Sequence, residues 1–359
     1  MKILYAASLS PNDSALYRQW ALERLGHKVI SLNSIPYAPS NPTVRRIVFR
    51  LAMGPHVERL NRDILELAQE EKPDLLWADK LLWMQPATLD RLRAMGISTV
   101  SYMIDNPFGP RRDPGWRLYM KDIPHYDLHV VQRDKNIEDY RSHGARDVIK
   151  VQTAYEPTLH FPPPEGWSDR DRDRDVSFLG THYDNRGEIL SKLSEEFSVA
   201  VSGPPRGWQR ALTPDQYSKL YREGELYRDQ YREAIWRSKI NLSFITHSNQ
   251  DEFVHKSFEI TGCGAFLLAE RSQGHMDRFV EGEEAVFFTG YDELVQKIRR
   301  YLPDEAARTR IAAAGYRRAE RDGYHNDRQV SRIVERIEEI QRSSGRAVVG
   351  STRDAGSIR

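Results

Sequence analysis

Residues 240–270 read INLSFITHSNQDEFVHKSFEITGCGAFLLAE. The stretch begins with an apolar run that ends near Thr246, and after a polar loop its pattern predicts a short helix over residues 252–261. Gly262 and Gly264 then turn the chain into a second apolar run, AFLLAE. A strand, a helix and a strand in this order form a βαβ unit, in which the two strands are parallel.

The same alternation extends over most of the 359 residues. Short runs that are apolar throughout are typical of parallel strands covered on both faces, and they recur between segments with helical patterns. The runs are KILYAAS, KVISLN, DLLWA, STVSYMI, LHVVQ and VIKVQTA, followed by VSFLG, FSVAVSG, INLSFI, AFLLAE and AVFFTG. The sequence therefore predicts an α/β protein with two βαβ domains.

The composition breaks between the two sets of runs. Residues 161–175 read FPPPEGWSDRDRDRD, three prolines followed by alternating opposite charges, a pattern that buries no apolar face. We therefore expect an N-terminal domain over residues 1–161, a linker over 162–175 and a C-terminal domain over 176–342. The last residues, 343–359, lack periodicity, and we expect a disordered tail there.

Composition narrows the classes of function. Lys and Arg number 53 against 52 Asp and Glu, a formal charge of +1 that gives no support to a nucleic-acid-binding protein. Cys263 is the only cysteine, so neither an intramolecular disulfide nor a thiolate metal cluster can form, which suits a reducing cytosol. No run approaches the roughly 18 apolar residues of a membrane span. We expect a cytoplasmic protein, with association at the inner face of the membrane left open.

The DRDRDRD string contains Asp-x-Asp, a spacing at which two carboxylates can share one Mg²⁺ or Mn²⁺. Every intervening residue is Arg, however, and the string follows prolines instead of an apolar strand. The 11 histidines show no short ligand spacing such as HExxH. We therefore expect a solvated segment here, and neither a metal site nor a cofactor.

The predicted helix after Thr246 is a candidate anion site. The amides near Phe253 to Lys256 precede the intrahelical hydrogen-bond pattern and point toward the carboxyl end of the preceding strand, where phosphates commonly bind. Lys256 adds a positive charge, and Glu259 lies three residues further on roughly the same helix face. Its carboxylate could accept hydrogen bonds from a diol such as a ribose, although Lys-x-x-Glu is also common as a surface ion pair.

The segment DEFVHKSFEITGCGAFLL resembles the donor-binding segment of GT-B glycosyltransferases, in which two acidic residues are separated by seven others. Asp251 and Glu259 have this spacing, with Asp in the place of the more usual Glu, so the resemblance leaves open whether Asp251 or Glu252 faces the sugar. The ordered set KSFEITGCGAFLLAE, FVEGEEAVFF, YDELVQKIRRYL, ARTRIAAAGYRRA and YHNDR resembles the C-terminal domain of the CgeB-like (spore-maturation-protein-like) group, related to glycosyltransferase families 1 and 4.

The resemblance implies the GT-B architecture: two Rossmann-like domains facing a cleft, with a UDP-, GDP- or TDP-linked sugar bound mainly by the second. Glu259 would bind the ribose hydroxyls, and Lys256 with nearby amides would bind the diphosphate. Gly180 and Arg186 would approach the phosphates from the other side, and Tyr221 could stack on the nucleobase. Arg186 could equally be a surface charge, and Tyr221 could equally belong to an exposed amphipathic helix.

Transfer with inversion also requires a general base near the acceptor hydroxyl. Asp105, which follows the run STVSYMI, and Asp13, in the loop after the first run, are the candidates, with turn formation and helix capping as the alternatives for them. A retaining enzyme would need no such base. Residues 43–60, TVRRIVFRLAMGPHVERL, have the pattern of a helix on anionic lipid or on a lipid-linked acceptor, or of an ordinary helix packed on the sheet.

Together these features predict a metal-independent glycosyltransferase that serves a bacterial surface polysaccharide or glycoconjugate. The acceptor would be a glycan, a lipid-linked molecule or a small molecule. Two other interpretations remain open: a GT-B-like nucleotide-binding protein without turnover, and a nucleotide-sugar 2-epimerase.

Overall fold

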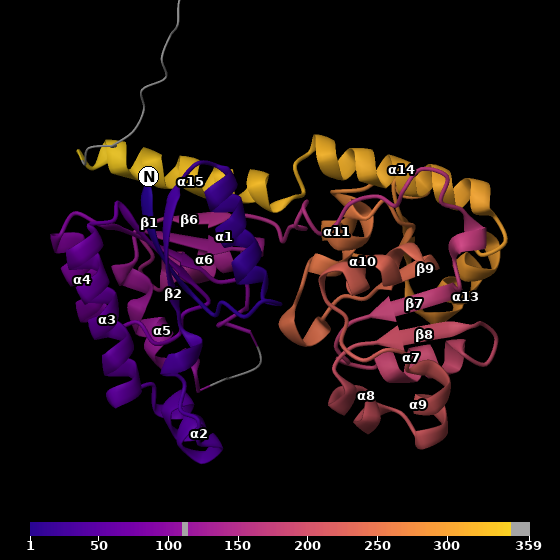
Figure 1. Cartoon of the computed structure of the whole chain (residues 1–359), viewed down its shortest axis with the longest axis horizontal. Coiled ribbons are helices and arrows are strands. Elements are labelled where there is room, and N and C mark those ends of the chain that lie inside the picture. The colour runs from indigo at the N-terminus through magenta and orange to yellow at the C-terminus, as the bar shows by residue number, and fades with distance from the viewer. Residues whose placement is uncertain (110–113, 346–359) are drawn as a thin grey trace, which may run out of the picture. The chain divides into compact units, whose positions relative to one another are not determined.

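The computed structural model describes residues 1–109 and 114–345. These residues form two compact units: unit 1 combines the described residues up to 152 with residues 327–345, and unit 2 comprises residues 153–326. Figure 1 shows a sheet flanked by helices in each unit. The two sheets confirm the predicted α/β fold with two Rossmann-like units.

Unit 1 is built on a six-stranded sheet of order β2-β1-β3-β4-β5-β6, in which every neighbouring pair is parallel. Its strands are β1 (Lys2–Ala7), β2 (Lys28–Asn33), β3 (Leu75–Asp79), β4 (Ser98–Tyr102), β5 (Leu128–Val131) and β6 (Val148–Lys150). Its helices are α1 (Ser14–Arg24), α2 (Pro42–Leu51), α3 (Pro55–Glu71), α4 (Pro86–Ala94), α5 (Trp116–Asp122), α6 (Asp134–Ser142) and α15 (Asn326–Ser343). Short 3₁₀ turns cover Ile35–Tyr37 and Ile123–His125.

Both faces of this sheet are buried, as the uninterrupted apolar runs require. Residues Ile3, Tyr5 and Ala7 of β1 point to the face covered by α1 and α15, whereas Leu4 and Ala6 point to the face covered by α3 and α4. The alternation follows from the two-residue period of a strand.

Unit 2 is built on a five-stranded parallel sheet of order β11-β10-β9-β7-β8. Its strands are β7 (Arg174–Leu179), β8 (Val199–Ser202), β9 (Ser238–Ser243), β10 (Leu267–Glu270) and β11 (Val286–Phe288). Its helices are α7 (Arg186–Leu193), α8 (Pro205–Ala211), α9 (Pro214–Leu220), α10 (Arg228–Trp236), α11 (His255–Gly262), α12 (Gln273–Met276), α13 (Gly290–Tyr301) and α14 (Glu305–Arg321), with 3₁₀ turns at Asp169–Asp171 and His247–Asn249.

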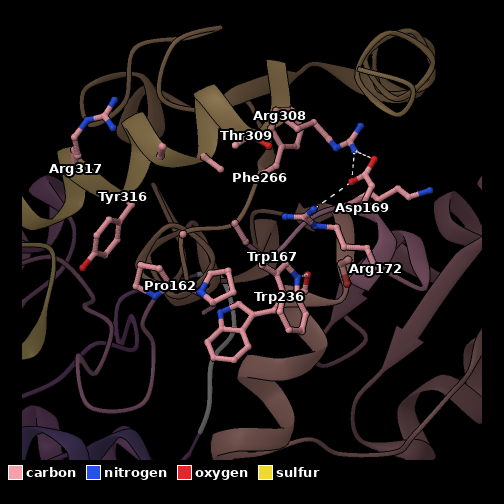
Figure 2. Close-up of a pocket in the computed structure, with 17 residues that line it drawn as sticks. Pro162, Trp167, Asp169, Arg172, Trp236, Phe266, Arg308, Thr309, Tyr316 and Arg317 are labelled. Carbon is pink, nitrogen blue, oxygen red and sulfur yellow. Dashed lines mark hydrogen bonds and ion pairs between the residues drawn. The ribbon is translucent and has the colours of Figure 1, made fainter. Parts of the chain in front are cut away.

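The predicted linker over residues 162–175 is instead a folded part of unit 2, which corrects the domain boundaries. Asp169 binds the guanidinium of Arg308 on α14, with 2.6 Å between Nη2 and Oδ1, and Asp175 binds Lys239 of β9 at 2.8 Å. Figure 2 shows Asp169 between Arg308 and Arg172. The prediction was wrong because most partners of the alternating charges lie on other elements, beyond the reach of local sequence patterns.

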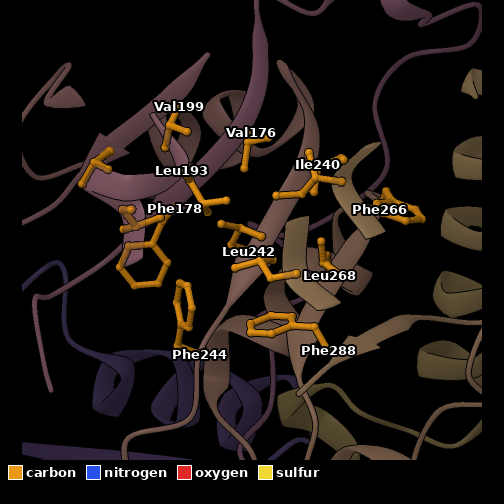
Figure 3. Close-up of a cluster of buried hydrophobic side chains, with 14 of the residues drawn as sticks. Val176, Phe178, Leu193, Val199, Ile240, Leu242, Phe244, Phe266, Leu268 and Phe288 are labelled. Atoms are coloured by element: carbon orange, nitrogen blue, oxygen red, sulfur yellow. The ribbon is translucent and has the colours of Figure 1, made fainter. Parts of the chain in front are cut away.

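The main core of unit 2 lies on one face of its sheet, under α7 and α13. Figure 3 shows Phe178, Leu242, Leu268 and Phe288 of four strands converging there. The opposite face of the sheet is covered by α10 and α11, which contribute Ile235, Phe258 and other apolar side chains to a second cluster.

Helix α15 corrects a second boundary, because residues 327–342 were assigned to the C-terminal domain. The helix returns to unit 1 and buries Val330, Ile333, Val334 and Ile337 against its sheet. Its apolar period shows that one helix face is buried but not which sheet covers it. Of the predicted tail over 343–359, residues 346–359 lie outside the described residues.

We expect Ile337→Ala to lower the free energy of unfolding by about 2–4 kcal/mol, because it opens a cavity between α15 and the first sheet. Ile337 is fully buried. Urea unfolding followed by circular dichroism measures the change. The control is Glu339→Ala, which removes an exposed side chain from the same helix. Equal stability of the two variants would show that α15 is not part of this core.

Candidate functional site

The candidate site lies at the carboxyl edge of the second sheet, where parallel strands bring their following loops together. Gly180 directly follows β7, and α11 follows β9. The helix begins at His255 instead of residue 252, so its first-turn amides belong to residues 255–257 and not to Phe253. The residue before it, Val254, has an apolar side chain that cannot cap these amides, although its backbone carbonyl accepts from the Ser257 amide at 3.2 Å.

Three side chains form a continuous chain of hydrogen bonds at this edge. Lys256 Nζ donates to the hydroxyl of Tyr231 at 2.9 Å, and that hydroxyl donates to Glu259 Oε2 at 2.7 Å. All three side chains are partly buried. Sequence reasoning placed Lys256 and Glu259 on one helix face and missed Tyr231, because Tyr231 lies on the separate helix α10. The sequence offered only an indirect indication that Tyr231 lies near them: the helices α10 and α11 precede and follow the same strand, β9.

Burial and neighbouring charges set the ionisation of this chain of residues. Burial lowers the pKa of Lys256 to about 8, with Arg186 acting in the same direction and Glu259 opposing it. Burial alone would raise the pKa of Glu259, but the nearby His160 and Lys256 outweigh it and hold this pKa below its ordinary value. At neutral pH the site therefore holds a carboxylate acceptor beside a protonated amine that loses its proton in the weakly alkaline range.

Gly180 leaves room for the lysine. A Cβ at this position would lie 3.1 Å from Lys256 Cε and 3.4 Å from Nζ. The carbonyl of Gly180 accepts a hydrogen bond from the indole Nε1 of Trp208 at 2.9 Å, and a Cβ on Gly203 would lie 2.0 Å from the same carbonyl oxygen. The loop after β7 is thus fixed by close approach of the loop after β8.

Arg186 is a buried structural residue as well as a neighbour of the site, which excludes the surface-charge interpretation. Its guanidinium donates to Thr181 O at 3.1 Å, to Ile245 O at 3.1 Å and to Thr246 Oγ1 at 3.1 Å, so it ties the loop after β7 to the loop after β9. Within the described residues its Nε has no hydrogen-bond partner. Arg186 also lines a pocket of about 370 Å³ that includes Glu270 and Tyr291.

Phe253 lies in the loop before the first turn of α11. Its side chain is buried in the core, where its ring packs 5.7 Å from that of Phe258 and the guanidinium carbon of Arg278 lies 4.0 Å above it. The loop before α11 also holds Asp251, whose Oδ1 accepts from Asn249 at 2.9 Å.

Glu252 and Tyr221 are engaged in local structure. The backbone carbonyl of Glu252 accepts from Ser272 Oγ at 2.6 Å. Tyr221 directly follows α9; its hydroxyl donates to Gly203 O at 2.5 Å, and its ring stacks on Tyr217 with centroids 4.4 Å apart. One face of the Tyr221 ring is therefore already covered, and the residue anchors the Gly203 loop.

The two candidate bases lie in unit 1, after the carboxyl ends of β1 and β4. Asp105 is 45% exposed and pairs with Lys80 at 2.9 Å. Asp13 directly precedes α1, but within the described part of the chain its carboxylate makes no capping bond; instead its Oδ2 accepts from Ser8 Oγ at 2.6 Å. Capping, the alternative for Asp13, is therefore not what the structure shows.

A second pocket, of about 230 Å³, lies at the amino edge of the second sheet (Figure 2). Trp167, Trp236 and Phe266 line it, and the pair of Asp169 and Arg308 lies on one side. The DRDRDRD string thus contributes to this edge, away from Lys256.

Across residues 1–109 and 114–345, no group of three or more His, Cys, Asp or Glu side chains is placed to hold a metal ion. Among the helices in these ranges, none is both long and apolar enough to cross a membrane.

We expect Gly203→Ala to lower the free energy of unfolding by more than about 2 kcal/mol, because the new Cβ would overlap the Gly180 carbonyl. Gly207→Ala is the matched control, since its Cβ would meet only His182 Cβ at 3.5 Å. Urea unfolding of both variants measures the difference. If both variants are as stable as the parent, the close approach of the two loops is not a constraint.

Comparison with known proteins places these features in a fold family. The model of a family described as "Glycosyl transferase-like" matches residues 186–335. A search of curated protein sequences found no match.

Solved structures resemble the whole chain. Sucrose-phosphate synthase from Thermosynechococcus elongatus has a TM-score of 0.70 at 11% identity, covering 96% of this chain and 100% of that chain. Anabaena HepE in complex with UDP-glucose has a TM-score of 0.64 at 13% identity, covering 94% and 100%. A structure titled "Trehalose-6-phosphate from E. coli bound with UDP-2-fluoro glucose" has a TM-score of 0.63 at 12% identity, covering 95% and 99%. The chain thus has the GT-B fold, and most of its second unit matches the glycosyl transferase-like family.

Proposed function

We propose that this protein is a glycosyltransferase that moves a sugar from a nucleoside-diphosphate sugar to an acceptor hydroxyl. The observation that carries the proposal is the Lys256–Tyr231–Glu259 chain at the carboxyl edge of the second sheet, inside the region that matches the glycosyl transferase-like family. Similar structures whose titles name UDP or UDP-glucose make UDP the first nucleotide to test.

The chemistry of the site suits a nucleoside diphosphate. The Glu259 carboxylate can accept hydrogen bonds from two vicinal hydroxyls, as a ribose presents them. Departure of the diphosphate builds negative charge, which the Lys256 ammonium and the first-turn amides of α11 can stabilise. Tyr231 already donates to Glu259 and accepts from Lys256, so it holds both groups in position before a ligand binds.

Arg186 takes a role that differs from the phosphate contact implied by the resemblance, whereas Asp105 and Asp13 remain the candidate bases. Arg186 donates three of its hydrogen bonds to groups in the loops after β7 and β9, so we assign it the role of holding the phosphate-binding loops together. Asp105 is the preferred base for an inverting reaction, because it is an exposed carboxylate at the carboxyl edge of the first sheet. Asp13, hydrogen-bonded to Ser8, is the second candidate.

We also propose that transfer is independent of metal, since Lys256 and the α11 amides can supply the positive charge. The ordered motifs of the C-terminal half support membership of the CgeB-like group, and with it hexosyl or other glycosyl transfer in bacterial surface polysaccharide or glycoconjugate synthesis at the cytoplasmic side. The motif resemblance alone supports these finer assignments.

The first test is a thermal-shift panel of UDP, GDP and TDP, with and without EDTA, on the parent and on Glu259→Ala. We expect one diphosphate to stabilise the parent regardless of EDTA, and Glu259→Ala to weaken its binding by about 1–3 kcal/mol, because the ribose loses a charged acceptor. Glu233→Ala is the control, an exposed carboxylate on α10.

Several outcomes would contradict this proposal. Unchanged affinity in Glu259→Ala would remove the ribose role, and loss of binding in EDTA would favour a metal-dependent enzyme. Incubation with the matching nucleotide-sugar distinguishes the two alternative functions from sugar transfer. A nucleotide-binding protein without turnover leaves the nucleotide-sugar intact, and a 2-epimerase converts the free nucleotide-sugar without any acceptor.

We expect the affinity for UDP to fall as pH rises through about 8, by up to roughly tenfold per pH unit, because Lys256 then loses its proton. The phosphate charge stays constant in this range, since its last pKa is about 6. Titration calorimetry between about pH 7 and 9.5 measures the slope. Lys256→Arg is the control, because guanidinium stays protonated and should flatten the profile. The same slope in both proteins would exclude Lys256 as the titrating group.

A further inference from the structure

Helix α2 (Pro42–Leu51) is a well-formed helix with an unusually exposed apolar face. Asn41 caps it by accepting hydrogen bonds from the amides of Thr43 and Val44, at 2.9 and 3.2 Å. Val48 is buried, and the Phe49 ring packs so closely on Gly115 that a Cβ there would lie 2.4 Å from it. The helix, labelled in Figure 1, is therefore already folded, and Val48 and Phe49 fix it to unit 1.

The other side of the helix presents apolar side chains to solvent. Val44, Ile47 and Leu51 are 41%, 51% and 45% exposed, and Met53 just after the helix is 60% exposed. At 100° per residue, the three helical positions form one continuous stripe. Scattered exposed apolar residues need no explanation, but a stripe of this kind on one short helix indicates an interaction surface.

The charged side chains of this helix all have one sign. Arg45, Arg46 and Arg50 are exposed on the same helix. No Asp or Glu occurs anywhere between residues 29 and 57. A preformed helix that combines an exposed apolar stripe with several arginines has the pattern by which proteins lie on anionic bilayers.

We propose that α2 binds the surface of an anionic lipid bilayer, with Val44, Ile47, Leu51 and Met53 entering the headgroup region and the arginines contacting lipid phosphates. A second copy of the chain is a poorer occupant of the stripe. A twofold contact would bring the arginines of both copies together, with no acidic residue in this segment to balance them. The proposal is independent of the proposed sugar transfer.

The test is co-sedimentation of the full chain with vesicles of phosphatidylcholine alone and with roughly 30% phosphatidylglycerol added. We expect binding to the anionic vesicles only, weakened at about 0.5 M salt. Ile47→Ser/Leu51→Ser should reduce binding by about tenfold or more, because two apolar insertions are lost. Neutralising the arginines to Gln should cost about fivefold for each one.

Met95→Ser is the matched control, since it removes a 40% exposed apolar side chain after α4 in the same unit. It should leave vesicle binding unchanged, and circular dichroism should show that all variants keep the parent fold. Equal binding to neutral vesicles, or no loss in Ile47→Ser/Leu51→Ser, would overturn the proposal. So would a dimer in analytical ultracentrifugation that this double variant abolishes, because the stripe would then be a contact between copies.

Discussion

Parallel pairing of β9 between β7 and β10 is the constraint on which the arrangement of the second unit depends. The chain steps across the sheet in the same direction from β8 to β9 and from β9 to β10, and right-handed crossovers therefore place α10 and α11 on one face. Helix α7, which connects β7 to β8 in the opposite direction, lies on the other face. Tyr231 of α10 thus meets Lys256 and Glu259 of α11 as a consequence of topology.

In each unit, a buried arginine on the helix after the first strand of the unit connects two neighbouring segments at the carboxyl edge of the sheet. In unit 1 the guanidinium of Arg18, on the helix after β1, binds Asp79 at the end of the neighbouring strand β3, with Nε–Oδ2 and Nη2–Oδ1 distances of 2.6 and 2.8 Å. In unit 2 Arg186, on the helix after β7, binds Ile245 O beyond the end of the neighbouring strand β9. A buried cation is costly, and in both units the planar guanidinium offsets that cost with several hydrogen bonds.

The features that could be predicted from the sequence are those that depend on local periodicity. Apolar runs predicted both sheets, and helical spacing placed Lys256 and Glu259 on one face of α11. The sequence was insufficient where a partner lies far along the chain. Asp169 pairs with Arg308 of α14, Asp175 pairs with Lys239 of β9, and α15 packs on a sheet that begins about 300 residues earlier. The position of Tyr231 and the burial of Arg186 were unpredictable for the same reason. Each residue contacts a segment that follows a different strand of the sheet.

The exposed stripe of α2 has a defined relation to the first sheet. Helix α2 follows the carboxyl end of β2, and Asp13 and Asp105 follow the carboxyl ends of β1 and β4 in the same parallel sheet. A bilayer bound along α2 would therefore lie on the side of unit 1 that carries both candidate bases. An acceptor hydroxyl borne by a lipid would reach that edge by diffusion in two dimensions, so the helix would raise the local concentration of acceptor without contacting it. The arginines of α2 would then contribute to the rate of encounter, and the carboxyl edge alone to the chemistry.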